Sequence, residues 1–134
     1  EIINREAAFR HCPNQALARF LPHVAVKSLQ SGDELQYAGQ TAKFVYLIVS
    51  GTFEAASEGG QKVNVQSGFL GQEAAIGMDL NIVTAVATSG SSVLVIPKAA
   101  IWELSKYPEF HQDLLNSFTS LFGREPKAVE DEML

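Results

Sequence analysis

The sequence predicts a mainly β fold, an antiparallel jelly-roll barrel flanked by α-helices at its two ends. Three observations predict this fold class. Between residues 24 and 97, apolar residues occur in short runs or alternate with polar neighbours, as they do in strands. Glycine and small polar residues separate these runs and are typical of turns. Helical spacing of apolar side chains is found only before and after this region, which favours a barrel or jelly roll.

The first predicted element is helical and spans residues 4–21, with Pro13 interrupting it. Its apolar side chains fall near helical spacing at Ala7, Ala8, Ala16, Leu17, Phe20 and Leu21. From Val24 onward the period changes to two. Val24 and Val26 alternate with polar neighbours, which predicts a strand with one buried face.

The next strands follow one another across short turns. Leu35 and Tyr37 alternate with polar residues across a Gly32-Asp33 turn, which is typical of a strand. The unbroken apolar run 44–49 predicts a strand that is buried on both faces. The segment 58–60, Glu-Gly-Gly, predicts a hairpin, because paired turn positions often need positive φ.

Two further β-branched runs, 82–88 and 93–96, precede Pro97, which ends the strand region. Beyond it lies an apolar stripe at helical spacing, which predicts two helices divided by Pro108 and ended by Gly123. The stripe consists of Ile101, Leu104, Tyr107, Leu114, Leu115, Phe118, Leu121 and Phe122. We therefore expect one domain over residues 1–123, with a barrel at 24–97 and helices at 98–122. Residues 124–134 form a charged tail or the start of a linker.

Composition excludes several classes of protein. The formal net charge is −5, whereas proteins that bind nucleic acid usually carry an excess of basic residues. No apolar run approaches the roughly 20 residues of a membrane-spanning helix, and no secretory signal is present. A single cysteine, Cys12, suits a reducing compartment, so we expect a cytoplasmic location. Because the chain begins at Glu1 and not at methionine, we expect a piece of a longer host protein.

Catalytic and metal-binding chemistry finds no support in the sequence. His11, His23 and His111 are not paired with one another or with carboxylates at metal-ligand spacing. Cys12 has no neighbouring base and is interpreted as a small apolar helix residue. No grouping of serine, histidine and aspartate has the spacing of a known hydrolase. We therefore expect no enzyme activity, no metal and no cofactor.

A resemblance rests on the glycines and their surroundings. The stretch 29–35, then Gly39, then 45–51 with Tyr46 and Gly51 resembles the opening strands of the cyclic nucleotide-binding domain family. The resemblance covers roughly residues 9–122, and members occur in catabolite activator-type regulators and regulatory subunits of cyclic-AMP-dependent kinases. It implies a regulatory domain whose ligand is cyclic AMP or cyclic GMP. It also implies signal transmission by movement of the C-terminal helix.

Residues 68–86, here called the cassette, resemble the phosphate-binding cassette of that family. Gly68, Glu73, Ala75 and Ile76 match a motif of the form Gly-Asp-x-Phe-Gly-Glu-(Leu/Ile)-Ala-Leu, and Glu73 would bind the ribose. A one-residue slip instead pairs Gly71-Gln72 with the Gly-Glu of the motif and leaves Glu73 outside the site. The ligand-binding positions implied by the resemblance are Gly71, Gln72, Glu73, Ala74, Ala75, Ile82, Val83 and Thr84.

The family's phosphate-binding arginine is replaced. Nine positions after Glu73 stands Ile82, and no lysine or arginine lies between Val63 and Pro97. Loss of one partner of a buried charge pair costs about 2–5 kcal/mol, so cyclic nucleotide binding is expected to be weak or lost. Three explanations stay open: a fold that lost its ligand, a pocket retuned to an uncharged ligand, or a substitute cation. Candidates for that cation are Lys43, Lys62 and Lys98.

A protein-interaction module is the alternative function. The stripe from Leu114 to Phe122 could form a two-fold helix interface in a homodimer or dock onto a host protein, with Trp102 and Phe110 as aromatic surface. Packing of the stripe within the chain competes with this interpretation.

Overall fold

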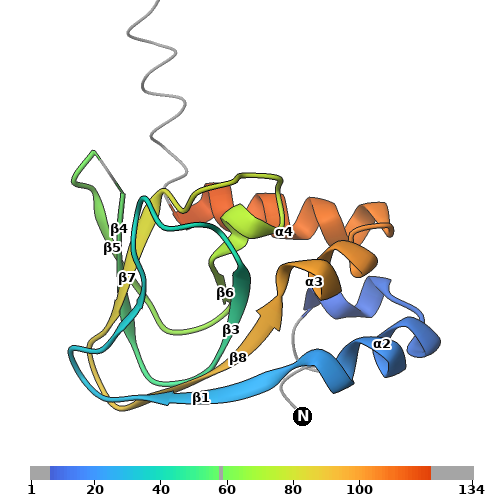
Figure 1. The fold of residues 1–134 in the computed structure, drawn as a ribbon, viewed down its shortest axis with the longest axis horizontal. Coiled ribbons are helices and arrows are strands. Elements are labelled where there is room, and N and C mark those ends of the chain that lie inside the picture. Colours follow the sequence, from blue (N-terminus) through green and yellow to red (C-terminus); the bar gives the residue numbers. More distant parts are fainter. Residues whose placement is uncertain (1–6, 58, 122–134) are drawn as a thin grey trace, which may run out of the picture.

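The computed structural model describes residues 7–57 and 59–121, and the strands and helices form separate parts of it (Figure 1). The N-terminal part contains three short helical segments. They are η1 (Ala7–His11), α2 (Asn14–Phe20) and η2 (Leu21–His23). Pro13 explains the break between the first two, because it lacks an N–H and sits in extended conformation directly before α2. Residues 4–6 of the predicted helix lie outside the described residues.

Eight strands form two antiparallel four-stranded sheets, which confirms the predicted mainly β, jelly-roll fold class. The first sheet has the order β1-β8-β3-β6 and the second has the order β2-β7-β4-β5. Because the order of each sheet ends in two edge strands, the sheets do not close into a barrel. The strands are β1 (Ala25–Leu29), β2 (Glu34–Gln36), β3 (Phe44–Ser50), β4 (Phe53–Ser57), β5 (Lys62–Val65), β6 (Phe69–Leu70), β7 (Val83–Ala87) and β8 (Ser91–Pro97).

Strand β3 lies between two hydrophobic clusters, as its unbroken apolar run predicts. Val45 and Leu47 belong to a cluster shared with the helices, whereas Tyr46 and Ile48 belong to a cluster between the sheets. Burial on both faces is therefore confirmed for the centre of the strand. The two end positions, Phe44 and Val49, are each 38% exposed, because no element covers the strand there as completely as at its centre. The predicted hairpin joins β4 to β5.

Two apolar residues of the alternating stretches are exposed. Val26 is 69% exposed, and every residue of β1 before Leu29 is exposed, so neither face of the strand is covered there. Tyr37 is exposed, whereas its neighbour Gln36 is only 3% exposed. The pairing of β2 with β7 shifts register between Glu34 and Gln36, and such an irregularity breaks the alternation of inward and outward side chains.

Two C-terminal helices, α3 (Lys98–Leu104) and α4 (Pro108–Leu121), complete the described part, as the division at Pro108 predicts. Phe9 and Phe110 stack at 5.4 Å between ring centroids, which joins η1 to α4. Phe110 and Leu114 are 0% exposed, so the expectation that Phe110 adds aromatic surface is wrong, while Trp102 is 49% exposed. Phe122 and Gly123 lie outside the described residues. Over residues 7–57 and 59–121, no helix is long and apolar enough to cross a membrane.

Candidate functional site

The cassette begins with a turn that only glycine accommodates. Strand β6 leads into Gly71, which has φ of 75°, and the short 3-10 helix η3 (Gln72–Ala74) follows. A Cβ atom on Gly71 would lie 2.8 Å from the carbonyl oxygen of Phe44 and 3.0 Å from Cδ2 of Tyr46. Both the positive φ and the close approach of β3 therefore require glycine at this position.

Glu73 turns into the protein and binds the start of β7. Its side chain is 0% exposed, and Oε2 accepts hydrogen bonds from the backbone N–H groups of Ile82 at 3.1 Å and Val83 at 3.0 Å. A third bond comes from Nε2 of Gln36 at 3.1 Å. Glu73 thus spans the cassette from η3 to β7 and holds two consecutive backbone amides.

The electrostatics of Glu73 are dominated by its burial. Loss of solvent raises the pKa of this carboxyl above its usual range, and the hydrogen bonds from the backbone and from Gln36 offset only part of that effect. The other carboxyl oxygen, Oε1, has no hydrogen-bond partner among the described residues. Burial of this carboxyl therefore costs free energy, and hydrogen bonds from three donors hold it in place.

Gln36 is a site residue that the sequence analysis missed. Its Nε2 donates both to Glu73 and to the carbonyl oxygen of Val83, at 2.8 Å. Two acceptors on one side fix the orientation of the amide, so Oε1 points away from Glu73. Nothing in the sequence indicates that Gln36 is buried beyond its place next to Leu35. The register shift in this strand breaks the alternation that would have turned Gln36 toward solvent.

Gln72 faces the helices instead of the sheets. Its side chain is 1% exposed, and Nε2 donates to the carbonyl oxygen of Phe69 and to Oγ of Ser117 on α4, both at 2.9 Å. Ser117 was not singled out from the sequence. The two neighbouring residues Gln72 and Glu73 thus connect the cassette in two directions, one to α4 and one to β7.

Helix α3 holds the far end of η3. The indole Nε1 of Trp102 donates to the carbonyl oxygen of Ala74 at 3.1 Å, and Nζ of Lys98 donates to the carbonyl oxygen of Met78 at 3.5 Å. The same ammonium lies 5.0 Å from the centre of the Trp102 ring. Ala74 and Ala75 are buried in the cluster shared with the helices.

The remaining predicted positions carry no charge. Ile82 packs partly buried against the cluster between the sheets, and Val83 is 3% exposed within it. Oγ1 of Thr84 accepts a hydrogen bond from the backbone N–H of Ala38. The structure therefore brings Glu73, Ile82 and Val83 together, whereas Gln72, Ala74 and Thr84 contact other elements.

Of the three candidate substitute cations, Lys98 contacts the cassette, through the carbonyl oxygen of Met78 and not through Glu73. Lys62 is exposed on β5, and Lys43 lines a cavity of about 430 Å³ together with Gln36, Tyr46 and Asn81. Within the part of the chain that the structure describes, no lysine or arginine side chain bonds to Glu73. No cluster of three or more potential metal ligands occurs in that part either.

Comparison with known proteins agrees with the fold described above. The sequence model of the family described as "Cyclic nucleotide-binding domain" matches residues 26–107. No curated protein matches the chain at the level of sequence.

Several solved structures share the fold. The catabolite activator protein of Thermus thermophilus superposes with a TM-score of 0.70 at 17% identity, over 96% of this chain and 63% of that one. The sensor domain of the regulator DNR from Pseudomonas aeruginosa superposes with a TM-score of 0.70 at 15% identity, over 94% of this chain and 89% of that one. The regulatory subunit of a cAMP-independent protein kinase A from Trypanosoma brucei superposes with a TM-score of 0.73 at 13% identity, over 92% of this chain and 45% of that one. The chain thus spans less than two thirds of the Thermus and Trypanosoma chains.

Proposed function

The chain belongs to the cyclic nucleotide-binding domain family, and we propose that it is a non-catalytic regulatory module whose cassette binds cyclic AMP and cyclic GMP weakly or not at all. One observation carries this proposal. The backbone amides of Ile82 and Val83, which follow η3 and would be free to hold an anion, already bind the chain's own carboxylate at Glu73. An incoming phosphate would have to displace a buried, hydrogen-bonded group before it gained those donors.

The replacement of arginine by Ile82 supports the same conclusion. An arginine binds a phosphate through charge-assisted, bidentate hydrogen bonds, and an isoleucine side chain offers none. Ile82 instead contributes to the apolar cluster between the sheets. A phosphate placed here would lose its hydration without an opposite charge to compensate.

The alignment of the cassette with the family motif does not alter the proposal. The left-handed turn at Gly71, which requires glycine, favours the slipped register, in which Gly71-Gln72 takes the place of Gly-Glu. In that register the ribose-binding carboxylate becomes a neutral amide that already bonds to Phe69 and Ser117. In the other register the carboxylate of Glu73 is engaged with β7. Either way, the polar groups of the cassette are satisfied within the chain.

A regulatory role without cyclic AMP has a parallel in this fold. The Trypanosoma brucei regulatory subunit that shares it is described as part of a cAMP-independent kinase. Retuning of the pocket toward an uncharged ligand is compatible with the same observations, since Ile82 and Val83 make its wall apolar.

Isothermal titration calorimetry with cyclic AMP and cyclic GMP tests the proposal directly. We expect dissociation constants in the millimolar range or no heat of binding, because a missing buried charge pair weakens binding by roughly thirtyfold to several thousandfold. A micromolar dissociation constant for either nucleotide would overturn it. Adenosine serves as the matched ligand without phosphate, and equal binding of adenosine and cyclic AMP would point to the retuned pocket.

A further inference from the structure

A groove between α2 and α3 is unrelated to the cassette. Its volume is about 560 Å³, and α2, η2, the end of β8 and α3 supply its walls. The apolar lining includes Ala16, Phe20, Ala100 and Leu104, each of which is less than a tenth exposed. None of the residues that line the groove belongs to the cassette, so what binds there leaves Glu73 and its partners untouched.

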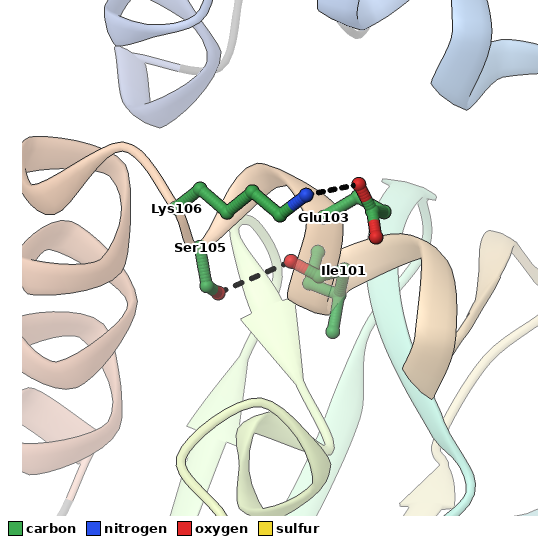
Figure 2. A network of polar contacts seen from close by, with 4 residues as sticks. All are labelled: Ile101, Glu103, Ser105 and Lys106. Atoms are coloured by element: carbon green, nitrogen blue, oxygen red, sulfur yellow. Dashed lines mark hydrogen bonds and ion pairs between the residues drawn. The ribbon is translucent and has the colours of Figure 1, made fainter.

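The polar residues of the groove are Arg19, His23, Glu103 and Lys106. Figure 2 shows how two of them neutralise each other at the end of α3, where Nζ of Lys106 donates to Oε1 of Glu103 at 2.8 Å. In the same turn Oγ of Ser105 donates to the carbonyl oxygen of Ile101 at 3.1 Å, which fixes the chain before Lys106 (Figure 2).

Arg19 supplies a surplus positive charge. Its guanidinium forms no ion pair with any residue in the ranges 7–57 and 59–121. The hydrogen bond and charge of Lys106 are the main causes that lower the pKa of Glu103, and the charge of Arg19 adds a smaller effect in the same direction. Arg19 lines the groove from α2, opposite the residues of α3.

We propose that this groove binds a small amphipathic monoanion, an aliphatic carboxylate whose chain lies on the apolar floor and whose carboxylate pairs with Arg19. The volume fits a chain of medium length, and concave apolar sites with a few polar groups are the usual form of small-molecule sites. A single surplus cation on a chain of formal net charge −5 matches one negative charge and not several. Guanidinium and carboxylate pair through two parallel hydrogen bonds.

Titration calorimetry with three probes of defined chemistry tests the proposal. Decanoate is expected to bind at one saturable site. Butyrate should bind at least about a hundredfold more weakly, because it buries six methylene groups fewer. Decyltrimethylammonium, which keeps the chain and reverses the charge, should bind about tenfold more weakly than decanoate because it cannot pair with Arg19. Equal binding of decanoate and decyltrimethylammonium would overturn the pairing with Arg19.

Two pairs of variants locate the site. Arg19→Gln should weaken decanoate binding about three- to tenfold, whereas Arg10→Gln, an exposed arginine outside the groove, should leave it unchanged. Ala99→Trp places a large side chain on an exposed position that lines the groove and should abolish decanoate binding. Ala18→Trp is the control, because Ala18 is also an exposed helix residue but does not line the groove, and it should leave binding intact. Circular dichroism of each variant confirms that it is folded.

Nuclear magnetic resonance shows whether decanoate binds in the groove or elsewhere on the protein. Decanoate should shift backbone amide signals of residues 16–23 and 97–107. Shifts confined to the cassette, or no binding at millimolar decanoate, would reject the proposal without bearing on cyclic nucleotides. It is also rejected if sedimentation shows a dimer that decanoate leaves intact and nuclear magnetic resonance places the dimer interface on residues 16–23 and 97–107.

Discussion

Glu73 is a carboxyl that the folded chain holds in a fully buried position. Its pKa is raised in the folded chain, chiefly by loss of solvent, relative to about 4.3 in an unfolded chain. The folded chain therefore binds this proton more tightly than the unfolded chain does. By linkage, the contribution of Glu73 to stability is greatest below the unfolded pKa and declines as pH rises through the folded pKa.

Glu73→Gln removes this dependence on pH, because glutamine keeps an oxygen for the three donors but does not titrate. We expect the stability of the wild type relative to the variant to fall as pH rises from about 4 until the carboxyl is ionised, and then to level off. Urea unfolding at a series of pH values measures this difference. A constant difference across the series would mean that burial does not shift the titration of Glu73.

Gly71 is the second residue on which the cassette depends. Gly71→Ala adds a methyl group within 2.8 Å of a backbone oxygen at a φ of 75°, so we expect a loss of stability of about 1–3 kcal/mol. Gly60→Ala is the matched control, because Gly60 also has positive φ but has no atom within 4 Å of the added methyl group. If both substitutions cost the same in thermal unfolding, the contact with β3 has no effect.

At the scale of elements, helix α3 fixes the end of η3 through Trp102. Trp102→Phe retains an aromatic ring near Lys98 but removes the donor to Ala74, which costs about 1 kcal/mol. We expect faster hydrogen exchange of the backbone amides of Ala75, Ile76 and Met78, which bond within this segment. Amides in the β4–β5 hairpin provide the internal control and should exchange at unchanged rates.

The sequence predicted most elements, because strand and helix periods and turn residues are local signals. The pairing of β4 with β5, the two-sided burial of Val45–Ile48 and the division of the last helices at Pro108 all follow from such signals. The exposure of Val26 depends on which elements cover the faces of β1, which no local pattern encodes. The burial of Gln36 depends on a shift of register against a strand far along the chain.

The location of the candidate site stays a prediction, and its contacts were not predictable from the sequence. The resemblance pointed to residues 68–86, and the structure brings Glu73, Ile82 and Val83 of that segment together. That Glu73 would bind the amides of its own cassette could not be read from spacing, since an exposed carboxylate at the start of a helix has the same sequence pattern. Gln36 and Ser117 enter from β2 and α4, which only the tertiary fold places beside the cassette.

The whole molecule has the fold of a cyclic nucleotide-binding domain, and its sequence has no lysine or arginine between Val63 and Pro97. Ile82→Arg restores a cation in the cassette and should raise the affinity for cyclic AMP by about tenfold or more, as measured by calorimetry. Ile76→Arg adds the same charge at another partly buried cassette position and is the control. No gain from Ile82→Arg would mean that Glu73 and Gln72 also block the ligand.

The indole that closes the cassette against α3 has a practical consequence. Trp102 is the single tryptophan of the chain, it is half exposed, and its ring nitrogen bonds directly to Ala74. Excitation at tryptophan wavelengths therefore observes this one contact without any label. A shift of its emission on adding a compound would report a change in the surroundings of this indole, so the unlabelled protein can be screened for compounds that act on the cassette or on α3.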